Sequence, residues 1–239
     1  MADELAFLSR AKTWNAFYGE PRVAEFRLRL YVEAFGDEFP INAATDGYIT
    51  RTELRQMAAA LQVGPVHKIV DLGCGRGGPG LWIASTTGAA LVGIDFSEVA
   101  LRDACARSRE IGIADRVSYN LASFDATGLD AASLDGAFSV DVIWAIPDKF
   151  AGFAEAARIL KPGARFVFTD WERDVSPPGY PAPVNDHRPF LETSGFEVEA
   201  RQLHPEADTM RRTFYEKMIQ YEAELMQILD HKTAEPNVR

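Results

Sequence analysis

The stretch IVDLGCGRGGPG, residues 69–80, runs from an apolar segment into a cluster of glycines. Gly73, Gly75 and Gly78 fit the spacing G-x-G-x-x-G, which is typical of a turn that binds a dinucleotide. Glycines permit positive φ angles and let a ligand approach the backbone closely. Asp95 follows about 20 residues later, at the end of a predicted strand, where an acid can bind ribose hydroxyls. The pattern therefore predicts a cofactor with a nucleoside part.

The acid at Asp71 separates two cofactors that share this spacing. A carboxylate there would oppose the binding of a pyrophosphate at the helix N-terminus that follows. The same carboxylate favours a ligand with cationic groups, such as an amino acid that carries a sulfonium. In the segment SFDATGL, Phe124 offers an apolar face for a purine and Asp125 an acceptor for its exocyclic amine. Both features favour S-adenosylmethionine, and an NAD(P)-dependent dehydrogenase stays as the alternative.

The elements that must position these residues alternate along the chain between apolar strand-like runs and helix-like segments. This alternation predicts an α/β fold, a Rossmann-like, doubly wound, mostly parallel sheet with helices on both faces. In such a sheet, ligands bind outside the carboxyl ends of the strands, at the point where the strand order reverses. The predicted strands lie at 68–72, 90–95, 116–123, 136–146, 164–170 and 196–203, and the predicted helices at 79–86, 97–111, 149–160 and 188–194.

Two segments flank the predicted core, which spans residues 61–205. Residues 1–60 are predicted to form an N-terminal helical segment, and residues 206–239 a C-terminal helix and tail. Within the latter, 206–231 has the pattern of one amphipathic helix, which could cover the sheet or form a dimer face. Prolines in SPPGYPAPVNDHRP predict an irregular loop before the last core helix.

Composition limits the partners. With 25 basic and 35 acidic residues the formal charge is −10, so the chain is repelled by phosphate backbones and we expect no nucleic acid. No apolar run approaches the ~18–20 residues of a membrane span, and we expect no membrane partner. Two cysteines form neither a disulfide framework nor a metal-ligand spacing. We expect a cytoplasmic protein without a metal, acting on a small, neutral or cationic molecule.

Five segments, in this order, resemble the class I S-adenosylmethionine-dependent methyltransferases. The resemblance is strongest to the small-molecule branch that includes the sterol, ubiquinone/menaquinone and sarcosine/dimethylglycine types. It covers roughly residues 65–200, and the family more often has Gly-Asp where this chain has Phe124-Asp125. The family's sheet usually ends with a sixth and a seventh strand, of which FEVEARQL fits the sixth, and no seventh strand is found. The segments are VDLGCGRGG, VGIDFS, ASFDATGL, FSVDVIWAIPDK and RILKPGARFVFTDWE.

The resemblance implies roles for individual residues. The N-terminal segment is implied to be a lid, with Tyr18, Phe39 and Tyr48 closing over the sulfonium and the acceptor. Arg76 is predicted to be a solvated loop charge. The implied cofactor-binding residues are Asp71, Gly73, Gly75, Asp95, Phe96, Phe124, Asp125, Ser139 and Tyr18. The candidate catalytic residues, at the ends of the fourth and fifth strands, in the proline-rich loop and in the lid, are Asp141, Asp170, His187 and Tyr48.

The predicted reaction is methyl transfer to nitrogen or oxygen of a small molecule, and the acidic rim favours an amine. Because the methyl carbon is already activated, alignment and exclusion of water can supply most of the catalysis. A base is needed only where the acceptor loses a proton. The alternatives are a protein that binds S-adenosylmethionine without methylating and a methyltransferase that acts on proteins. The sequence leaves open whether the protein is a monomer or a homodimer.

Overall fold

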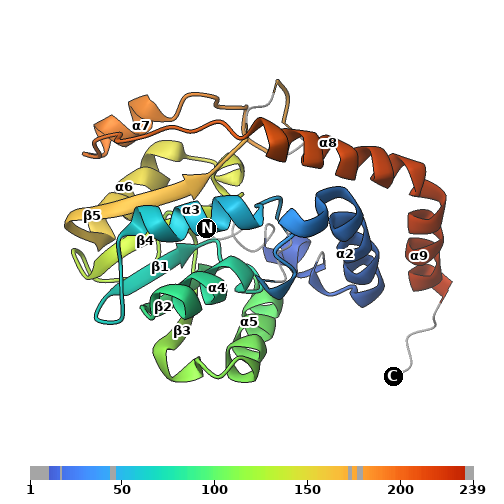
Figure 1. Ribbon diagram of the computed structural model, residues 1–239, viewed down its shortest axis with the longest axis horizontal. Coiled ribbons are helices and arrows are strands. Elements are labelled where there is room, and N and C mark those ends of the chain that lie inside the picture. The colour runs from blue at the N-terminus through green and yellow to red at the C-terminus, as the bar shows by residue number, and fades with distance from the viewer. Residues whose placement is uncertain (1–10, 17, 44–46, 172–173, 177–179, 235–239) are drawn as a thin grey trace.

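The computed structural model describes residues 11–16, 18–43, 47–171, 174–176 and 180–234. Its core is a five-stranded parallel sheet of order β3-β2-β1-β4-β5, which confirms the predicted fold class (Figure 1). The order reverses between β1 and β4, so the site is expected at their carboxyl ends. The strands are β1 Lys68–Leu72, β2 Ala90–Asp95, β3 Val117–Leu121, β4 Leu134–Val140 and β5 Leu160–Thr169.

Helices cover both faces of the sheet, as expected where parallel strands are apolar on both sides. One core joins Val70 to Phe153 of α6 and Leu191 of α7. The other joins Ile69 to Leu54 of α3 and to the residues of α4 that face it. Successive residues of β1 therefore face opposite layers. The helices are α3 Arg51–Leu61, α4 Gly78–Thr87, α5 Glu98–Glu110, α6 Lys149–Ile159 and α7 Arg188–Thr193.

A third apolar cluster lies beside the sheet, between the N-terminal helix α2 (Pro21–Phe35) and the C-terminal helices α8 (Pro205–Gln220) and α9 (Glu222–Ala234). In Figure 1, α8 crosses α2 and α9 turns down beside it. The predicted apolar stripe of the C-terminal segment thus packs on α2, and neither covers the sheet nor stays open. Its residues are Met210, Phe214, Met218, Tyr221, Leu225 and Ile228.

The single helix predicted over 206–231 is wrong, because the segment forms two helices. At Tyr221 the backbone leaves the helical region, at φ −102° and ψ 19°, while its N–H still donates to the Lys217 carbonyl. The Arg29 guanidinium of α2 lies 5.1 Å from the Tyr221 ring centroid and pairs with Glu224 at 2.8 Å. Contacts with α2 accompany a break that no glycine or proline marks in the sequence.

The strand predicted over residues 196–203 is also not formed. Its alternating pattern is real, since Phe196 and Val198 are half-buried between exposed glutamates. The Phe196 ring packs on Phe166 at 5.8 Å, and Glu199 pairs with Arg165 at 2.8 Å. Side-chain contacts thus hold the segment beside β5 without a hydrogen-bonded ladder, and β5 ends the sheet in the described part of the chain.

Candidate functional site

The glycine loop after β1 is left-handed at two of the three glycines of the predicted motif, Gly73 and Gly75, whereas Gly78 begins helix α4 and Gly77 is the third left-handed residue. Gly73, Gly75 and Gly77 have φ angles of 80°, 50° and 77°, a region that other residues rarely adopt. The N–H groups of Gly73 and Cys74 both donate to the Ile94 carbonyl of β2, at 2.8 and 2.9 Å. The loop is therefore fixed across the ends of two strands, in a position where a ligand can lie against its backbone.

Asp71 lies beneath this loop and is 1% exposed. Its Oδ2 atom is buried and has no hydrogen-bond partner in the structure. Burial, with the nearby charge of Asp95, raises the pKa of Asp71 well above its usual range, and the Gly80 N–H opposes this. An incoming cation would favour the ionised form. The unpaired acid thus fits a cofactor with a cationic amino group, as the sequence predicts.

Asp95, at the end of β2, accepts two backbone hydrogen bonds. Its Oδ2 accepts from the Gly75 N–H and its Oδ1 from the Ser97 N–H, both at 2.8 Å. Burial raises the pKa of Asp95, while these donors and the Phe96 N–H oppose the rise. Each carboxylate oxygen has a second lone pair, so the group can still accept from ribose hydroxyls. Asp71 and Asp95 thus lie at the same edge of the sheet, and their roles toward a cofactor stay predictions.

The N-terminal segment lies against the same loop. The Tyr18 hydroxyl is so close that a Cβ atom on Gly75 would lie 2.9 Å from it. Arg76 donates to the Tyr18 carbonyl at 2.7 Å and its guanidinium lies 5.5 Å from the Tyr18 ring centroid. Asn15 Oδ1 accepts from the Ser97 hydroxyl at 2.6 Å. These contacts bring Tyr18 to the loop, beside the predicted cofactor residues.

The prediction that Arg76 is a solvated charge is wrong. Its side chain is 18% exposed and pairs with Asp103 of α5 at 2.9 Å. Together with its bond to Tyr18, this ion pair links the N-terminal segment to α5 across the glycine loop. No sequence pattern indicates these partners, because they are distant from Arg76 along the chain.

Three predicted cofactor residues contact other protein groups. Phe124 is 7% exposed and packs in the core beside Phe166, with ring centroids 6.5 Å apart. The Ser123 hydroxyl donates to the Asp125 carboxylate. Ser139, fully buried, donates to the Leu72 carbonyl at 2.7 Å and so ties β4 to β1. Their roles toward a cofactor stay predictions.

At the end of β5, two of the predicted bases form a pair. His187 Nε2 lies 2.8 Å from Asp170 Oδ2, and the other oxygen of Asp170 accepts from the Trp171 N–H at 2.9 Å. The His187 ring packs on Phe153 and Phe168. Its Nδ1 atom is buried and has no partner in the structure. An aspartate that holds one ring nitrogen leaves the other available to accept a proton.

Asp141, directly after β4, contacts the other predicted catalytic residue. Its Oδ2 accepts from the Tyr48 N–H at 2.5 Å, and its Oδ1 from the Thr169 hydroxyl at 3.0 Å. Burial raises the pKa of Asp141 to about 6, against the effect of these donors. Burial also raises the pKa of the Tyr48 phenol. The two candidates are thus joined through the backbone of Tyr48.

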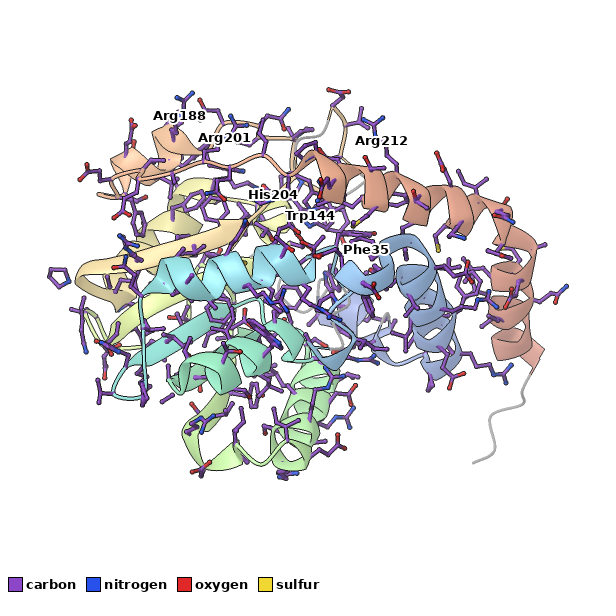
Figure 2. The ribbon with its side chains drawn as sticks, in the orientation of Figure 1. Phe35, Trp144, Arg188, Arg201, His204 and Arg212 are labelled. Carbon is purple, nitrogen blue, oxygen red and sulfur yellow. The ribbon has the colours of Figure 1, made fainter. Side chains whose placement is uncertain are left out.

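Aromatic side chains from distant parts of the chain surround Tyr48. Its ring lies 5.2 Å from that of Trp171 and 5.5 Å from that of Phe214, and its hydroxyl is 3.0 Å from the Tyr215 hydroxyl. Trp144, whose ring is 6.0 Å from that of Trp171, extends this wall between the sheet and the helices α2 and α8 (Figure 2). Phe214 and Tyr215 were not predicted as site residues, because nothing in the sequence of α8 distinguishes them from other packing residues.

Phe39, predicted to close over the site, packs elsewhere. It is 2% exposed, and its ring stacks on Tyr31 at 5.4 Å within the cluster beside the sheet. We therefore assign Phe39 to the packing of the N-terminal segment.

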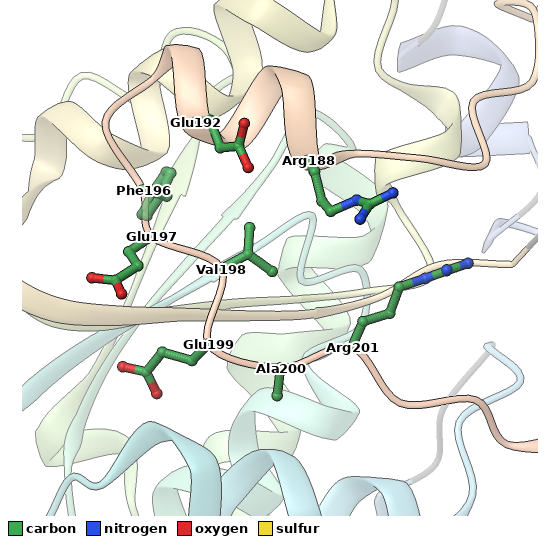
Figure 3. A pocket seen from close by; sticks show the side chains of 8 residues that line it. All are labelled: Arg188, Glu192, Phe196, Glu197, Val198, Glu199, Ala200 and Arg201. Carbon is green, nitrogen blue, oxygen red and sulfur yellow. The ribbon is translucent and has the colours of Figure 1, made fainter.

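A separate hollow of about 580 Å³ lies between α7 and the segment that follows it (Figure 3). Arg188 and Arg201 point the same way at one end, and Asp186 holds Arg188 through two bonds of 2.9 and 2.7 Å. None of the predicted site residues lines this hollow. The predicted cofactor and catalytic residues lie instead at or beside the carboxyl ends of the strands.

Comparisons with known proteins find a methyltransferase domain in this chain. Residues 70–168 match the family model described as "Methyltransferase domain". The 24-methylenesterol C-methyltransferase 2 of Oryza sativa subsp. japonica is 32% identical over 59% of this chain and 40% of that protein. The sarcosine/dimethylglycine N-methyltransferase of Halorhodospira halochloris is 31% identical over 66% of this chain and 56% of that protein. The chain thus spans less than two thirds of the length of these relatives.

A solved structure described as the [4+2]-cyclase SpnF has a TM-score of 0.64, at 20% identity, over 77% of this chain and 73% of that one. That likeness shows the fold alone. Residues 70–168 thus carry a methyltransferase domain, and the order of the parallel sheet agrees with that of class I S-adenosylmethionine-dependent methyltransferases. These relatives are named as methyltransferases of sterols and of sarcosine or dimethylglycine, in agreement with the small-molecule branch that the sequence resembles. No helix in the described ranges is both long and apolar enough to cross a membrane.

Proposed function

We propose that the protein transfers a methyl group from S-adenosylmethionine to nitrogen or oxygen of a small-molecule acceptor. The observation that carries the proposal is the buried Asp71, whose Oδ2 atom has no hydrogen-bond partner, next to a left-handed glycine loop and near the charge of Asp95. A pyrophosphate would meet an acid there, whereas a cationic amino-acid tail would meet its counter-charge. This chemistry supports S-adenosylmethionine over NAD(P).

The residues of the chain would divide the work as follows. Asp71 accepts from the amino group, the backbone at Gly73 and Gly75 lines the methionine half, and Asp95 accepts from the ribose. When bound, S-adenosylmethionine supplies a methyl carbon activated by its sulfonium. The N-terminal segment, held by Arg76, acts as the lid that excludes water from this carbon.

The acceptor would lie over the ends of β4 and β5, against the aromatic wall around Tyr48 and Trp171. His187, oriented by Asp170, is the group best suited to take a proton from an acceptor that must lose one. We favour an amine acceptor, because the net charge is −10 and aromatic faces attract cations. The two free cysteines are consistent with a cytoplasmic location. The apolar stripe of α8 packs on α2, which leaves a monomer as the simpler oligomeric state to test.

Calorimetry with S-adenosylhomocysteine, the product form of the cofactor, tests the proposal. We expect micromolar binding that Asp71→Ala abolishes, while Asp115→Asn, an exposed acid outside the site, leaves it unchanged. Absence of binding up to about 1 mM would refute the cofactor assignment. Stabilisation by NADH, and not by S-adenosylhomocysteine, would favour the dehydrogenase.

One observation favours a second candidate, a protein that binds S-adenosylmethionine without methylating. A chain described as a cyclase shares the fold, so the fold alone does not name the reaction. Incubation of metabolite extracts with methyl-labelled S-adenosylmethionine separates the two. Transfer of label to a small molecule supports the methyltransferase, and binding without transfer supports the alternative.

A further inference from the structure

Asp141 has an unusual backbone for its residue type. Its φ angle is 58°, in the left-handed region, directly after the last residue of β4. A non-glycine residue there costs roughly 1 kcal/mol and persists only where its surroundings hold it. Gln62 also has a positive φ angle, but it is the residue that caps the C-terminus of helix α3, where this conformation is common. The conformation of Asp141 therefore calls for a local reason.

The hydrogen bonds of Asp141 supply that reason. The Thr169 hydroxyl accepts from the Asp141 N–H and donates to Asp141 Oδ1, both at 3.0 Å. The Tyr48 N–H donates to Oδ2 at 2.5 Å, and the Trp144 indole N–H donates to the main-chain carbonyl of Asp141 at 2.8 Å. One residue thus connects the end of β5 with two aromatic residues of the acceptor wall.

This bonding argues against Asp141 as the base that the sequence suggested. Each carboxylate oxygen accepts from a protein donor, Oδ2 from the Tyr48 N–H and Oδ1 from the Thr169 hydroxyl, and both bonds favour the ionised form. Taking a proton at either oxygen would disturb these bonds, whereas the buried Nδ1 of His187 has no partner to lose. The contacts of Asp141 instead determine where Tyr48 and Trp144 lie.

We propose that Asp141 is a positioning residue of the acceptor site, which holds Tyr48 through its carboxylate and Trp144 through its main-chain carbonyl. The left-handed backbone lets the two groups point to different partners. This inference rests on the proposed function only in taking the aromatic wall as the acceptor site. It assigns the carboxylate to Tyr48 and the main-chain carbonyl to Trp144, so removal of the carboxylate alone should affect Tyr48 and spare Trp144.

Hydrogen exchange at the Tyr48 amide, measured without ligand, tests the carboxylate arm. Asp141→Gly keeps the left-handed backbone and removes the carboxylate. We expect Tyr48 exchange to be faster by roughly 10- to 100-fold, with the Trp144 indole N–H resonance unchanged. Asp141→Asn keeps an acceptor oxygen and should retain the protection. Gln62→Gly, a matched change at another left-handed residue, should move neither signal.

The pH profile gives a readout that a purely structural residue would not move. When the lid segment opens, water reaches the carboxyl group and its pKa of about 6 falls toward its ordinary value. The closed form then binds the proton more tightly, so Tyr48 protection, corrected for intrinsic exchange, should rise by ~10-fold or more as pH falls from about 7.5 to 4.5. Glu53 from α3 and Arg211 from α8 also act on this carboxyl group, in opposite directions. In Asp141→Asn the profile should be flat.

Three results would overturn the inference. The first is wild-type Tyr48 exchange in Asp141→Gly, and the second is an equal acceleration at amides throughout β4 and β5. The third is a wild-type profile as flat as that of Asp141→Asn. Failure to bind S-adenosylhomocysteine would instead refute the proposed function and leave the exchange results untouched.

Discussion

At the ends of β1 and β2, the residues that face the predicted cofactor are near neighbours in sequence. Asp71 and its glycines lie within one strand-to-helix turn, and Asp95 ends the adjacent strand. At the ends of β4 and β5, Tyr48, Asp141 and His187 come from separate segments of the chain. The cofactor half of the site, at the ends of β1 and β2, depends on backbone geometry. The acceptor half, at the ends of β4 and β5, depends on tertiary packing. Sequence patterns report the former more directly than the latter.

The largest expected effect is in the cofactor half, where the backbone itself matters. Gly73→Ala would place its Cβ 2.6 Å from a methyl of Val142, at a φ of 80°. We expect about 2–4 kcal/mol of destabilisation and at least ~100-fold weaker S-adenosylhomocysteine binding. Urea denaturation and calorimetry measure the two. Gly112→Ala, with φ 75° and open space around it, should cost only ~1 kcal/mol and leave binding unchanged. Equal effects of the two changes would remove the special role of the loop.

The next effect concerns the acceptor half and pH. The pKa of Asp141, at about 6 when folded, lies above its ordinary value of about 3.9. The folded state then holds a proton that the unfolded state has lost, so this contribution is present at low pH and disappears as pH rises through about 6. Between pH ~4 and ~7 the wild type should lose about 2–3 kcal/mol relative to Asp141→Asn. Urea denaturation at several pH values measures the unfolding free energy of both proteins. A difference between them that does not change with pH would contradict this prediction.

A smaller effect sharpens the ribose assignment. Asp95→Asn keeps the shape of the side chain but offers one carbonyl oxygen to the two N–H groups that Asp95 now satisfies. We expect S-adenosylhomocysteine binding to weaken by ~10- to 100-fold. Calorimetry measures this, and Asp115→Asn again serves as the control. Unchanged affinity would mean that the ribose finds its partner elsewhere.

The smallest effect lies at the rim of the acceptor wall. The hydroxyls of Tyr48 and Tyr215 are 3.0 Å apart, and Tyr215 is 45% exposed. A double-mutant cycle with Tyr48→Phe and Tyr215→Phe should give a coupling of about 0.5–1 kcal/mol in unfolding free energy. A coupling near zero would show that α8 covers the wall without bonding to it.

How far the sequence predicted each half follows from these physical differences. The alternation of apolar runs indicated the parallel sheet, and the loop at Gly73 indicated the cofactor edge, because both patterns are local. The pairing of Asp170 with His187 was not predictable, since only folding brings the end of β5 and the proline-rich loop together. The strand predicted over 196–203 failed for a related reason: alternation shows which side chains turn inward, not whether the backbone finds a partner.

The close contact between Gly73 and Val142 joins the cofactor side of the site to the acceptor side. Val142 directly follows Asp141, so its methyl groups join the loop of the cofactor half to the turn that holds Tyr48 and Trp144. A shift of either segment would change the packing of Val142 on Gly73. Occupancy of the two sub-sites should therefore be thermodynamically linked, and any gain in acceptor affinity with cofactor bound must equal the reverse gain. Because residue 73 is a glycine, Val142 can pack directly against the loop, and this contact would link the affinities of the two sub-sites.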